Sequence, residues 1–188
     1  SNMPVVYIQN FYSKEELNGI MTELHSLTEQ GLFFNYDEQY GTGSAVRDGV
    51  PLKNGKGLHL DGYYDGARDK SQILKTNRKL FSKEVTTTLE TYHTFYRYVG
   101  ESTEDNTKIH YFNQGNHYKR HIDSTCVTAI TYFHDIPKKF TGGELIIENS
   151  IKVPCLNNSL VIFPSILWHE VTPVVGTGRY AMSQFLSI

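Results

Sequence analysis

The sequence has little cysteine, no long apolar run and no visible targeting segment, and each absence removes a class of protein. Its two cysteines, Cys126 and Cys155, fall within stretches that favour strands. We expect them to be small buried residues in a reducing compartment, not a disulfide. No apolar run approaches the roughly 18 residues that a membrane helix needs, and no signal or transit peptide is visible. We therefore expect a cytoplasmic protein that does not span a membrane.

The sequence also lacks an excess of either charge. Lys and Arg total 18 against 20 Asp and Glu, which gives a net charge of −2. A balanced chain has no overall field that draws it to nucleic acid or to an anionic membrane, so we expect neither as a partner. We interpret the short lysine-rich stretches at 53–56 and 78–83 as solvated faces.

The first half of the chain has a helical and loop-rich pattern. Ser13 and Glu16 have the spacing of a capping box, and apolar residues at helical spacing predict a helix that ends at Gly31. Residues 35–69 contain seven glycines and little periodicity. This pattern is typical of hairpins and loops, which form either a lid or an irregular surface excursion. A second helical pattern runs over 71–98, in one or two pieces.

The second half consists of short apolar runs separated by turn residues, a pattern typical of jelly rolls and barrels. We predict one domain over 1–188, α+β but mainly β, with helices and lid loops in 1–106 and a jelly-roll core in 107–188. The eight predicted strands are Ile109–Phe112, His117–Asp123, Cys126–Phe133, Glu144–Glu148, Ile151–Val153, Leu160–Phe163, His169–Val174 and Tyr180–Leu186.

One His-x-Asp tripeptide lies within a predicted strand. His121 and Asp123 are two residues apart, so a strand places both side chains on one face. An imidazole and a carboxylate on one rigid face are two of the three ligands in the 2-His-1-carboxylate site of non-haem Fe(II) oxygenases. His169 lies 48 residues beyond His121, and Arg179 follows ten residues later. Four strand signals separate Asp123 from His169, as a barrel requires, so we predict that His169 is the third ligand.

A second His-x-Asp, at His59 and Asp61, has a similar spacing. His110 lies 51 residues beyond His59, and Arg120 follows ten residues later. The intervening chain is mostly helical in pattern, so it lacks the strands that would return His110 across a barrel. The tripeptide also falls in the glycine-rich region, which is a poor place for a rigid metal site. We favour the set at His121 and interpret His59 and Asp61 as lid or surface residues.

The last predicted strand places a guanidinium inside the barrel. Counting by two puts Arg179, Ala181, Ser183 and Phe185 on one face. A buried guanidinium needs an anion, and no acidic residue lies near it in this strand. We expect the anion to be a ligand carboxylate held bidentately, with Tyr132 placed to donate a second hydrogen bond.

Taken together, these pieces resemble the catalytic core of the prolyl-4-hydroxylase-like 2-oxoglutarate/Fe(II) dioxygenases. The resemblance covers about two-fifths of the chain, in the order and spacing of that family. Its pieces are Tyr111, HID at 121–123, CVTAITYF at 126–133, GGEL at 142–145, NNSLVIFPSILWHEVTPV at 157–174 and GRYAMS at 178–183.

The resemblance implies a double-stranded β-helix fold, flanked by N-terminal helices, and a role for each matched residue. It implies Fe(II), 2-oxoglutarate and O₂ as cofactor and cosubstrates, with ascorbate as a stimulant. By position, His121, Asp123 and His169 bind Fe(II); Arg179 binds the distal carboxylate of 2-oxoglutarate, assisted by Tyr132 and Ser183; and Tyr111 lines the cosubstrate or substrate pocket.

The resemblance also bears on the reaction. Related halogenases have a small residue at the position of Asp123, so a carboxylate there favours hydroxylation of an unactivated C–H bond, with release of succinate and CO₂. The leading substrate is a peptidyl proline or a similar protein side chain, and the alternative is a free amino acid or small metabolite. A different class remains open, a non-catalytic jelly-roll module that keeps the metal site as structure. We expect the loops at 35–69 and 113–117 to select the substrate.

Overall fold

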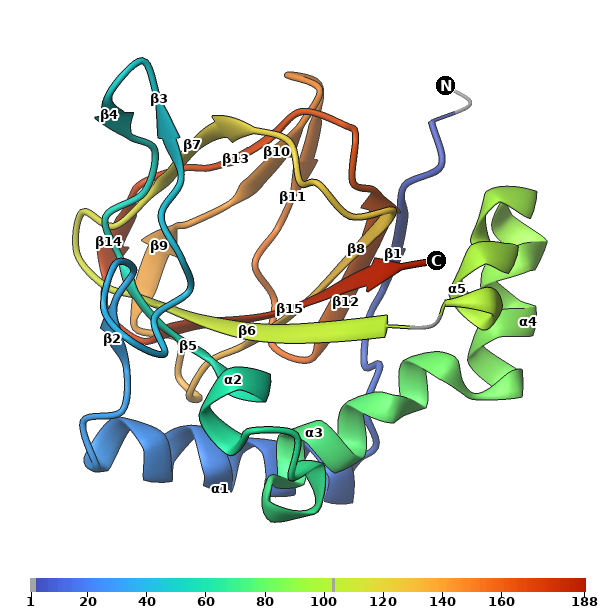
Figure 1. The fold of residues 1–188 in the computed structure, drawn as a ribbon, viewed down its shortest axis with the longest axis horizontal. Helices are drawn as coiled ribbons and strands as arrows, with labels where there is room; N and C mark the ends of the chain where they lie inside the picture. Colours follow the sequence, from blue (N-terminus) through green and yellow to red (C-terminus); the bar gives the residue numbers. More distant parts are fainter. Residues whose placement is uncertain (1–2, 103) are drawn as a thin grey trace.

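The structure is a computed structural model that describes residues 3–102 and 104–188, and Figure 1 shows its strands with the helices along one side. Its large sheet has seven strands, and all neighbours are antiparallel. In spatial order they are β1 (Val6–Ile8), β12 (Ser159–Pro164), β8 (Val127–Phe133), β15 (Arg179–Ser187), β6 (Glu104–Phe112), β5 (Lys56–His59) and β2 (Phe34–Asn35).

A second sheet of four strands faces the large one. Its order is β11 (Ile151–Val153), β10 (Leu145–Ile147), β13 (His169–Val171) and β7 (Tyr118–His121). Apolar side chains of both sheets form one buried cluster, with Val161 and Phe163 from β12 and Leu145 and Ile147 from β10. This is the predicted jelly roll. Two small pairs complete the strands, β14 (Val174–Gly176) with β9 (Phe140–Gly142), and β3 (Val46–Arg47) with β4 (Val50–Pro51).

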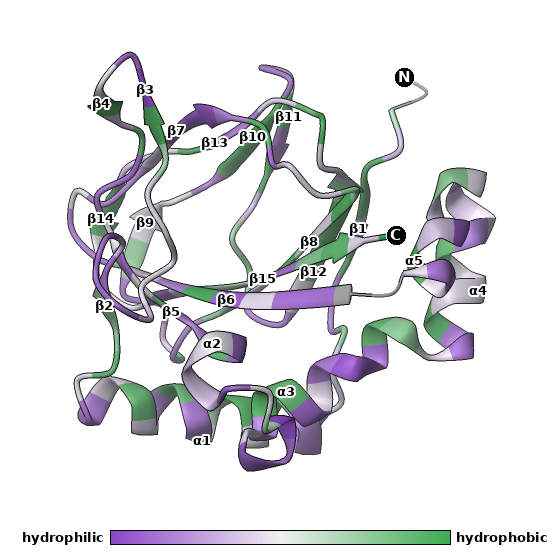
Figure 2. Ribbon diagram, in the orientation of Figure 1, coloured by the Kyte–Doolittle hydropathy of each residue, from purple (hydrophilic) through white to green (hydrophobic). Residues whose placement is uncertain are grey.

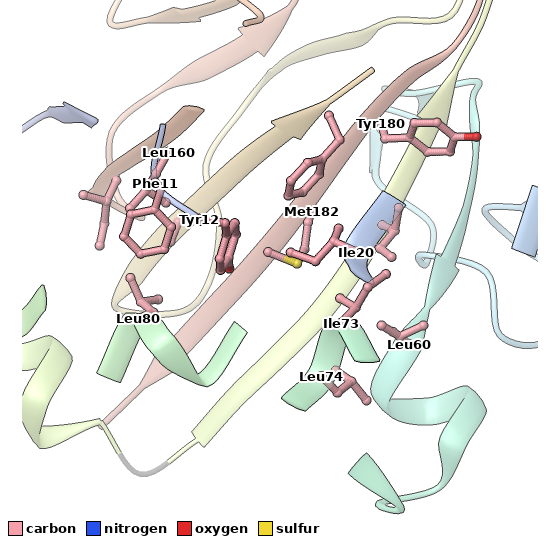
Figure 3. Close-up of a cluster of buried hydrophobic side chains, with 14 of the residues drawn as sticks. Phe11, Tyr12, Ile20, Leu60, Ile73, Leu74, Leu80, Leu160, Tyr180 and Met182 are labelled. Carbon is pink, nitrogen blue, oxygen red and sulfur yellow. The ribbon is translucent and has the colours of Figure 1, made fainter. Parts of the chain in front are cut away.

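The helices cover the outer face of the large sheet (Figure 1). Figure 3 shows Ile20 and Ile73 of this layer close to Met182 of β15. Burial of such side chains stabilises the contact by about 1.5–3 kcal/mol each. The elements are α1 (Lys14–Glu29), α2 (Leu60–Tyr64), η1 (Arg68–Lys70), α3 (Gln72–Thr76), η2 (Asn77–Phe81), α4 (Lys83–Tyr92), η3 (Thr94–Tyr96) and α5 (Arg97–Glu101).

The capping box at the start of α1 is confirmed. The Glu16 amide donates to the Ser13 hydroxyl, and the Ser13 amide donates to the Glu16 carboxylate. The helical pattern over 71–98 is more broken than we predicted. The Ser71 and Ser82 side chains each accept a hydrogen bond from a backbone amide three residues later, so each starts a new helix. Side-chain capping competes with continuation of a helix at these positions.

The division at residue 107 is wrong as a boundary between helices and sheet. β1, β5 and β2 lie in the first half of the chain, and all three belong to the large sheet. The predicted strand at 169–174 is two strands, β13 and β14, because Pro173 between them has no N–H to donate. β9 was not predicted. No helix among the described residues is both long and apolar enough to cross a membrane.

Hydropathy differs among the strands of the large sheet. Figure 2 shows β8, β12 and β1 as largely hydrophobic, whereas β6 carries a long hydrophilic stretch. β6 lies near the middle of the sheet, between β15 and β5. A hydrophilic stretch on an interior strand marks a face that is not packed as core.

Candidate active site

Two histidines and one aspartate converge where β7 and β13 lie side by side. His121, the last residue of β7, pairs directly with His169, the first residue of β13. Asp123 follows β7, and its backbone amide donates to the Ser165 carbonyl at 3.0 Å. An Asp123 carboxylate oxygen lies 3.6 Å from Nε2 of His121, and the other lies 3.2 Å from Nε2 of His169. The three potential ligand atoms all lie within 4.8 Å of one another.

Each histidine is held in the tautomer that ligates a metal through Nε2. Nδ1 of His121 lies 2.7 Å from the Lys119 carbonyl, and Nδ1 of His169 lies 2.9 Å from the Leu167 carbonyl. A carbonyl oxygen only accepts hydrogen bonds, so each Nδ1 must be the donor, and in the neutral ring the lone pair is then on Nε2. Such backbone partners orient metal-binding imidazoles. The geometry therefore presents two nitrogen donors and one carboxylate from one side.

The environment favours the ligating protonation states. Burial and the nearby His169 lower the pKa of His121 to about 4, so its imidazole is neutral at pH 7. Burial alone would raise the pKa of Asp123, but the neighbouring His169, the hydrogen bond from Thr128 and the nearby His121 hold it below its usual value in the metal-free chain. The Thr128 hydroxyl donates to Asp123 at 2.7 Å. Neutral imidazoles and an ionised carboxylate are the forms that bind a divalent metal.

Arg179 is a fully buried side chain without an acidic partner among the residues that the structure describes. It is 1% exposed, and its Nε donates to the Gly143 carbonyl at 2.8 Å. Its guanidinium lies 5.4 Å from the Phe112 ring and 5.3 Å from the Tyr132 ring. The buried Tyr132 hydroxyl has no hydrogen-bond partner among the described residues. A cation without an acid beside an orphaned hydroxyl fits a bound carboxylate.

Gly143 permits this position of Arg179. Its φ is +62°, and a Cβ built on it would lie 2.6 Å from Cδ of Arg179. Any larger residue there is both strained and in collision with the side chain.

The metal triad and Arg179 share one cavity of about 360 Å³. Its floor is the inner face of the large sheet, on which Arg179, Ala181, Ser183 and Phe185 alternate with outward residues, as the period of two predicts. Side chains from the neighbouring strands β6 and β8 also line the cavity. Asn106, Lys108, His110 and Phe112 come from β6, and Thr128 and Ile130 come from β8.

The family model of the 2OG-Fe(II) oxygenase superfamily matches residues 107–187, which contain the triad and Arg179. This part of the chain is therefore similar to the superfamily, and the match spans 81 of the 188 residues. Members use Fe(II), 2-oxoglutarate and O₂, and the His121, Asp123 and His169 donor set fits Fe(II).

Two curated relatives and two solved structures are similar to this chain. A PKHD-type hydroxylase from Nitrosomonas europaea is 33% identical over 92 residues, and one from Nitrosomonas eutropha is 31% identical over 91. Each match covers 40% of this chain and 40% of the relative. A Pseudomonas putida prolyl-4-hydroxylase superposes with a TM-score of 0.66 at 15% identity, over 98% of this chain and 92% of that one. A Trichoplax adhaerens prolyl hydroxylase, solved with a hypoxia-inducible-factor peptide fragment, gives 0.65 at 19%, over 98% and 83%. At these identities the superpositions show the fold.

The position that we predicted for Tyr111 is wrong. Tyr111 faces the helical side of β6, where its ring stacks on Tyr180 at 4.7 Å and lies 5.1 Å from Phe33. Side chains alternate along a strand, so its neighbours His110 and Phe112 take the inner face. A one-residue difference in register exchanges the two faces.

Four cavity residues were missed or misjudged. Lys53, which we placed on a solvated face, is only 4% exposed and lines the cavity. Tyr118 stacks on the His121 ring with centroids 3.7 Å apart. Lys108 and His110 had a sequence signal, because polar residues alternate with apolar ones along β6. That alternation marks a polar face turned inward.

His59 and Asp61 are neither lid nor metal ligands. Nε2 of His59 lies 2.6 Å from Oδ1 of Asn106. Asp61 accepts from Arg68 at 2.6 Å and from the Thr107 backbone amide at 2.6 Å. The pair joins α2 to β6, so the interpretation as lid or surface residues is wrong for Asp61.

Proposed function

We propose that the protein is a 2-oxoglutarate- and Fe(II)-dependent hydroxylase of an unactivated C–H bond. One observation carries this proposal. The His-Asp-His face opens into the same cavity as a buried arginine that has no acidic partner in the part of the chain that the structure describes. A non-catalytic metal module would need only the first of these two features. The pairing of a facial metal site with a site for an anionic cosubstrate supports an enzyme.

One set of residues would hold the metal, and another set would hold the cosubstrate. His121, Asp123 and His169 would hold Fe(II), while Arg179 and Tyr132 would hold the distal carboxylate of 2-oxoglutarate, with Ser183 beside them. When bound, the iron with O₂ and 2-oxoglutarate supplies the oxidising chemistry that hydroxylates the substrate and releases succinate and CO₂. Asp123 fills the metal position that would otherwise be open to a halide, which favours hydroxylation.

The chain itself must orient the ligands and keep water from the reacting centre. Lys119 and Leu167 fix the imidazoles through their carbonyls, and Thr128 fixes the carboxylate. Phe112 and Leu145 contribute apolar walls to the cavity. A dry, oriented site strengthens each electrostatic contact within it.

The substrate class that the relatives favour is a peptidyl proline or a similar protein side chain. The superposed structures are prolyl hydroxylases, and one of them was solved with a peptide fragment. A free amino acid or small metabolite is the second candidate, and it is favoured by the cationic lining of the cavity. Lys53 and Lys108 both contribute to that lining.

Succinate formation tests the proposal. The protein is supplied with Fe(II), 2-oxoglutarate, ascorbate and O₂, with a proline-containing peptide or free L-proline as the candidate substrate. We expect iron-dependent succinate and a product that gains one oxygen atom by mass spectrometry. Asp123→Ala is the inactive control, and Asp61→Ala is the matched control outside the site. Absence of both succinate and iron-dependent 2-oxoglutarate binding would establish the non-catalytic module instead.

A further inference from the structure

Two lysines meet at one threonine on the wall of the cavity. Lys53 follows β4, Lys108 lies in β6, and Thr42 lies in the loop between β2 and β3. Nζ of Lys53 donates to the Thr42 hydroxyl at 2.9 Å, and Nζ of Lys108 donates to the Thr42 carbonyl at 2.8 Å. All three residues line the cavity, and Lys53 and Thr42 are buried. The two ammonium groups therefore lie close together, and neither belongs to the metal triad.

No carboxylate pairs with either lysine among the described residues. Their other contacts are with aromatic rings, Lys53 over Tyr118 at 5.1 Å and Lys108 over Phe185 at 5.8 Å. Asp123 is the acid that faces them, and its charge raises the pKa of both, but its oxygens already contact the histidines and Thr128. Two buried cations without a committed anion are costly in a protein interior.

Burial lowers the pKa of both lysines, and the Asp123 charge acts in the opposite direction. Burial and the nearby Lys108 lower the pKa of Lys53 to about 8, which leaves its ammonium form predominant at pH 7. The pair therefore presents two positive charges to whatever enters the cavity.

The lysine pair lies at a different end of the cavity floor from Arg179. Lys108 pairs with Ser183 across the sheet, whereas Arg179 pairs with Phe112. Four residues along a strand span roughly 13 Å, so the two cationic points are far enough apart to hold different ligands. His110 lies between them, with a buried Nε2 that has no partner among the described residues.

A count of charges shows that the lysines are not needed for the cosubstrate. Fe(II) beside Asp123 leaves one positive charge, and the 2-oxoglutarate dianion beside Arg179 leaves one negative charge. These cancel. Lys53 and Lys108 then remain as two further cationic side chains on the wall of the same cavity.

We propose that Lys53 and Lys108 bind a carboxylate of the substrate, so that this hydroxylase acts on an acidic molecule. The inference rests on the proposed function and names the substrate chemistry within it. The carboxylate belongs either to a free amino acid or organic acid, or to an acidic side chain beside the target residue of a peptide. Nζ of each lysine donates to it in a charge-assisted hydrogen bond, and the neutral His110 is placed to contact a second polar group.

The experiment compares matched acidic and neutral probes. The first arm uses the twenty common L-amino acids and their carboxamides, each added to the protein with Fe(II), 2-oxoglutarate and O₂. The second arm uses a proline-containing peptide with Asp beside the proline and the same peptide with Asn there. Succinate formation above the substrate-free rate is measured, and probe binding to the Fe(II)-loaded protein is measured separately by anaerobic calorimetry.

Variants assign the effect to the lysines. Lys53→Met and Lys108→Met are expected to raise the KM of the acidic probe by about 10-fold each, because each loses a hydrogen bond to a charged group. Lys108→Arg keeps the charge and is expected to restore part of the affinity. Lys56→Met, on the exposed side of the same segment, is the matched control. Thermal unfolding of each variant shows that it is folded.

The outcomes separate the subsite from the proposed function. Stimulation by acids and not by their amides, weakened in both lysine variants but not in Lys56→Met, supports the subsite, and the arm that responds identifies its source. Equal stimulation by acids and amides overturns it. A loss of 2-oxoglutarate affinity as large as that of Arg179→Met also overturns it, since the lysines would then hold the cosubstrate. Lysine-dependent binding of an acid, with neither succinate nor iron-dependent 2-oxoglutarate binding, would keep the subsite and overturn the oxygenase.

Discussion

The chain contains two His-x-Asp tripeptides, and only one of them is available to a metal. Nε2 of His59 is occupied by Asn106, and the Asp61 carboxylate accepts from Arg68 and from a backbone amide. In the other tripeptide, His121 uses only Nδ1 for the backbone, so Nε2 faces Asp123 and His169. The same His-x-Asp pattern makes hydrogen bonds within the fold at His59 and Asp61, whereas at His121 and Asp123 it offers ligand atoms to a metal.

An arginine lies near each tripeptide in the fold: Arg68 contacts Asp61, and Arg179 shares the cavity of His121 and Asp123. These two arginines differ in whether an acid pairs with them. Arg68 is paired with Asp61 at 2.6 Å. Arg179 has no acidic partner among the described residues and faces the cavity. A cation that is paired with an acid of the fold stabilises the fold, whereas a buried cation without such an acid is available to an anionic ligand.

The largest expected contrast is between the two aspartates in iron binding. Asp123→Ala removes one of three ligands, and its loss should exceed that of an outer partner, so Fe(II) affinity falls at least about 100-fold. Asp61→Ala should leave Fe(II) affinity unchanged. Competition with a coloured chelator measures both. A similar loss in the two variants would show that the tripeptides are not functionally distinct.

The two arginines should differ in cosubstrate affinity. Arg179→Met removes charged hydrogen bonds worth about 3 kcal/mol, so the Kd for 2-oxoglutarate rises about 100-fold. The matched Arg68→Met variant should alter stability and leave this Kd unchanged. Anaerobic calorimetry with Fe(II) present measures the affinity. Unchanged binding in Arg179→Met would remove the assignment of Arg179 to the cosubstrate.

For the free energy of unfolding, we expect the larger effect from Asp61→Ala and the smaller one from Asp123→Ala. Asp61→Ala leaves Arg68 and the Thr107 amide without their acceptor, which we expect to cost about 2 kcal/mol. For a chain of this size the loss corresponds to a fall of about 6 °C in Tm. Asp123→Ala should lower the Tm of the metal-free protein less. Calorimetric unfolding measures both Tm values. An unaltered Tm in Asp61→Ala would show that the contacts of Asp61 do not stabilise the fold.

The smallest expected effect is a pH dependence of the metal-free fold. The pKa of His121 is about 4 in the folded protein, below its ordinary value, so the unfolded chain binds the proton first. His121 therefore reduces stability as pH falls from about 6.5 toward 4, by about 1 kcal/mol between pH 7 and 5.5.

Comparison with His121→Asn isolates this contribution. Burial raises the pKa of Asp105 to about 6, and this group acts in the opposite direction over part of the same range. Its contribution cancels in the difference between wild type and variant. Urea unfolding at several pH values measures that difference. A constant difference across this range would contradict the shifted pKa of His121.

Much of the site follows from the sequence because local periodicity determines which side chains share a strand face. A period of two places Arg179 with Ser183, and the observed face of β15 agrees. The same rule did not locate Tyr111, because the sequence does not show whether the odd-numbered or the even-numbered residues of β6 face the cavity. Lys53 was also misjudged, since its burial depends on Thr42 and Tyr118, which come from other segments.

The sequence by itself determined the strand-rich second half, the pairing of His121 with Asp123 on one edge, and an inward Arg179. These depend on neighbours within a few residues. Only the tertiary structure decided that His59 and Asp61 are bonded to other parts of the chain, and that two lysines meet at Thr42. Whether a polar atom is satisfied or free depends on partners far away in the chain, and only folding brings those partners together.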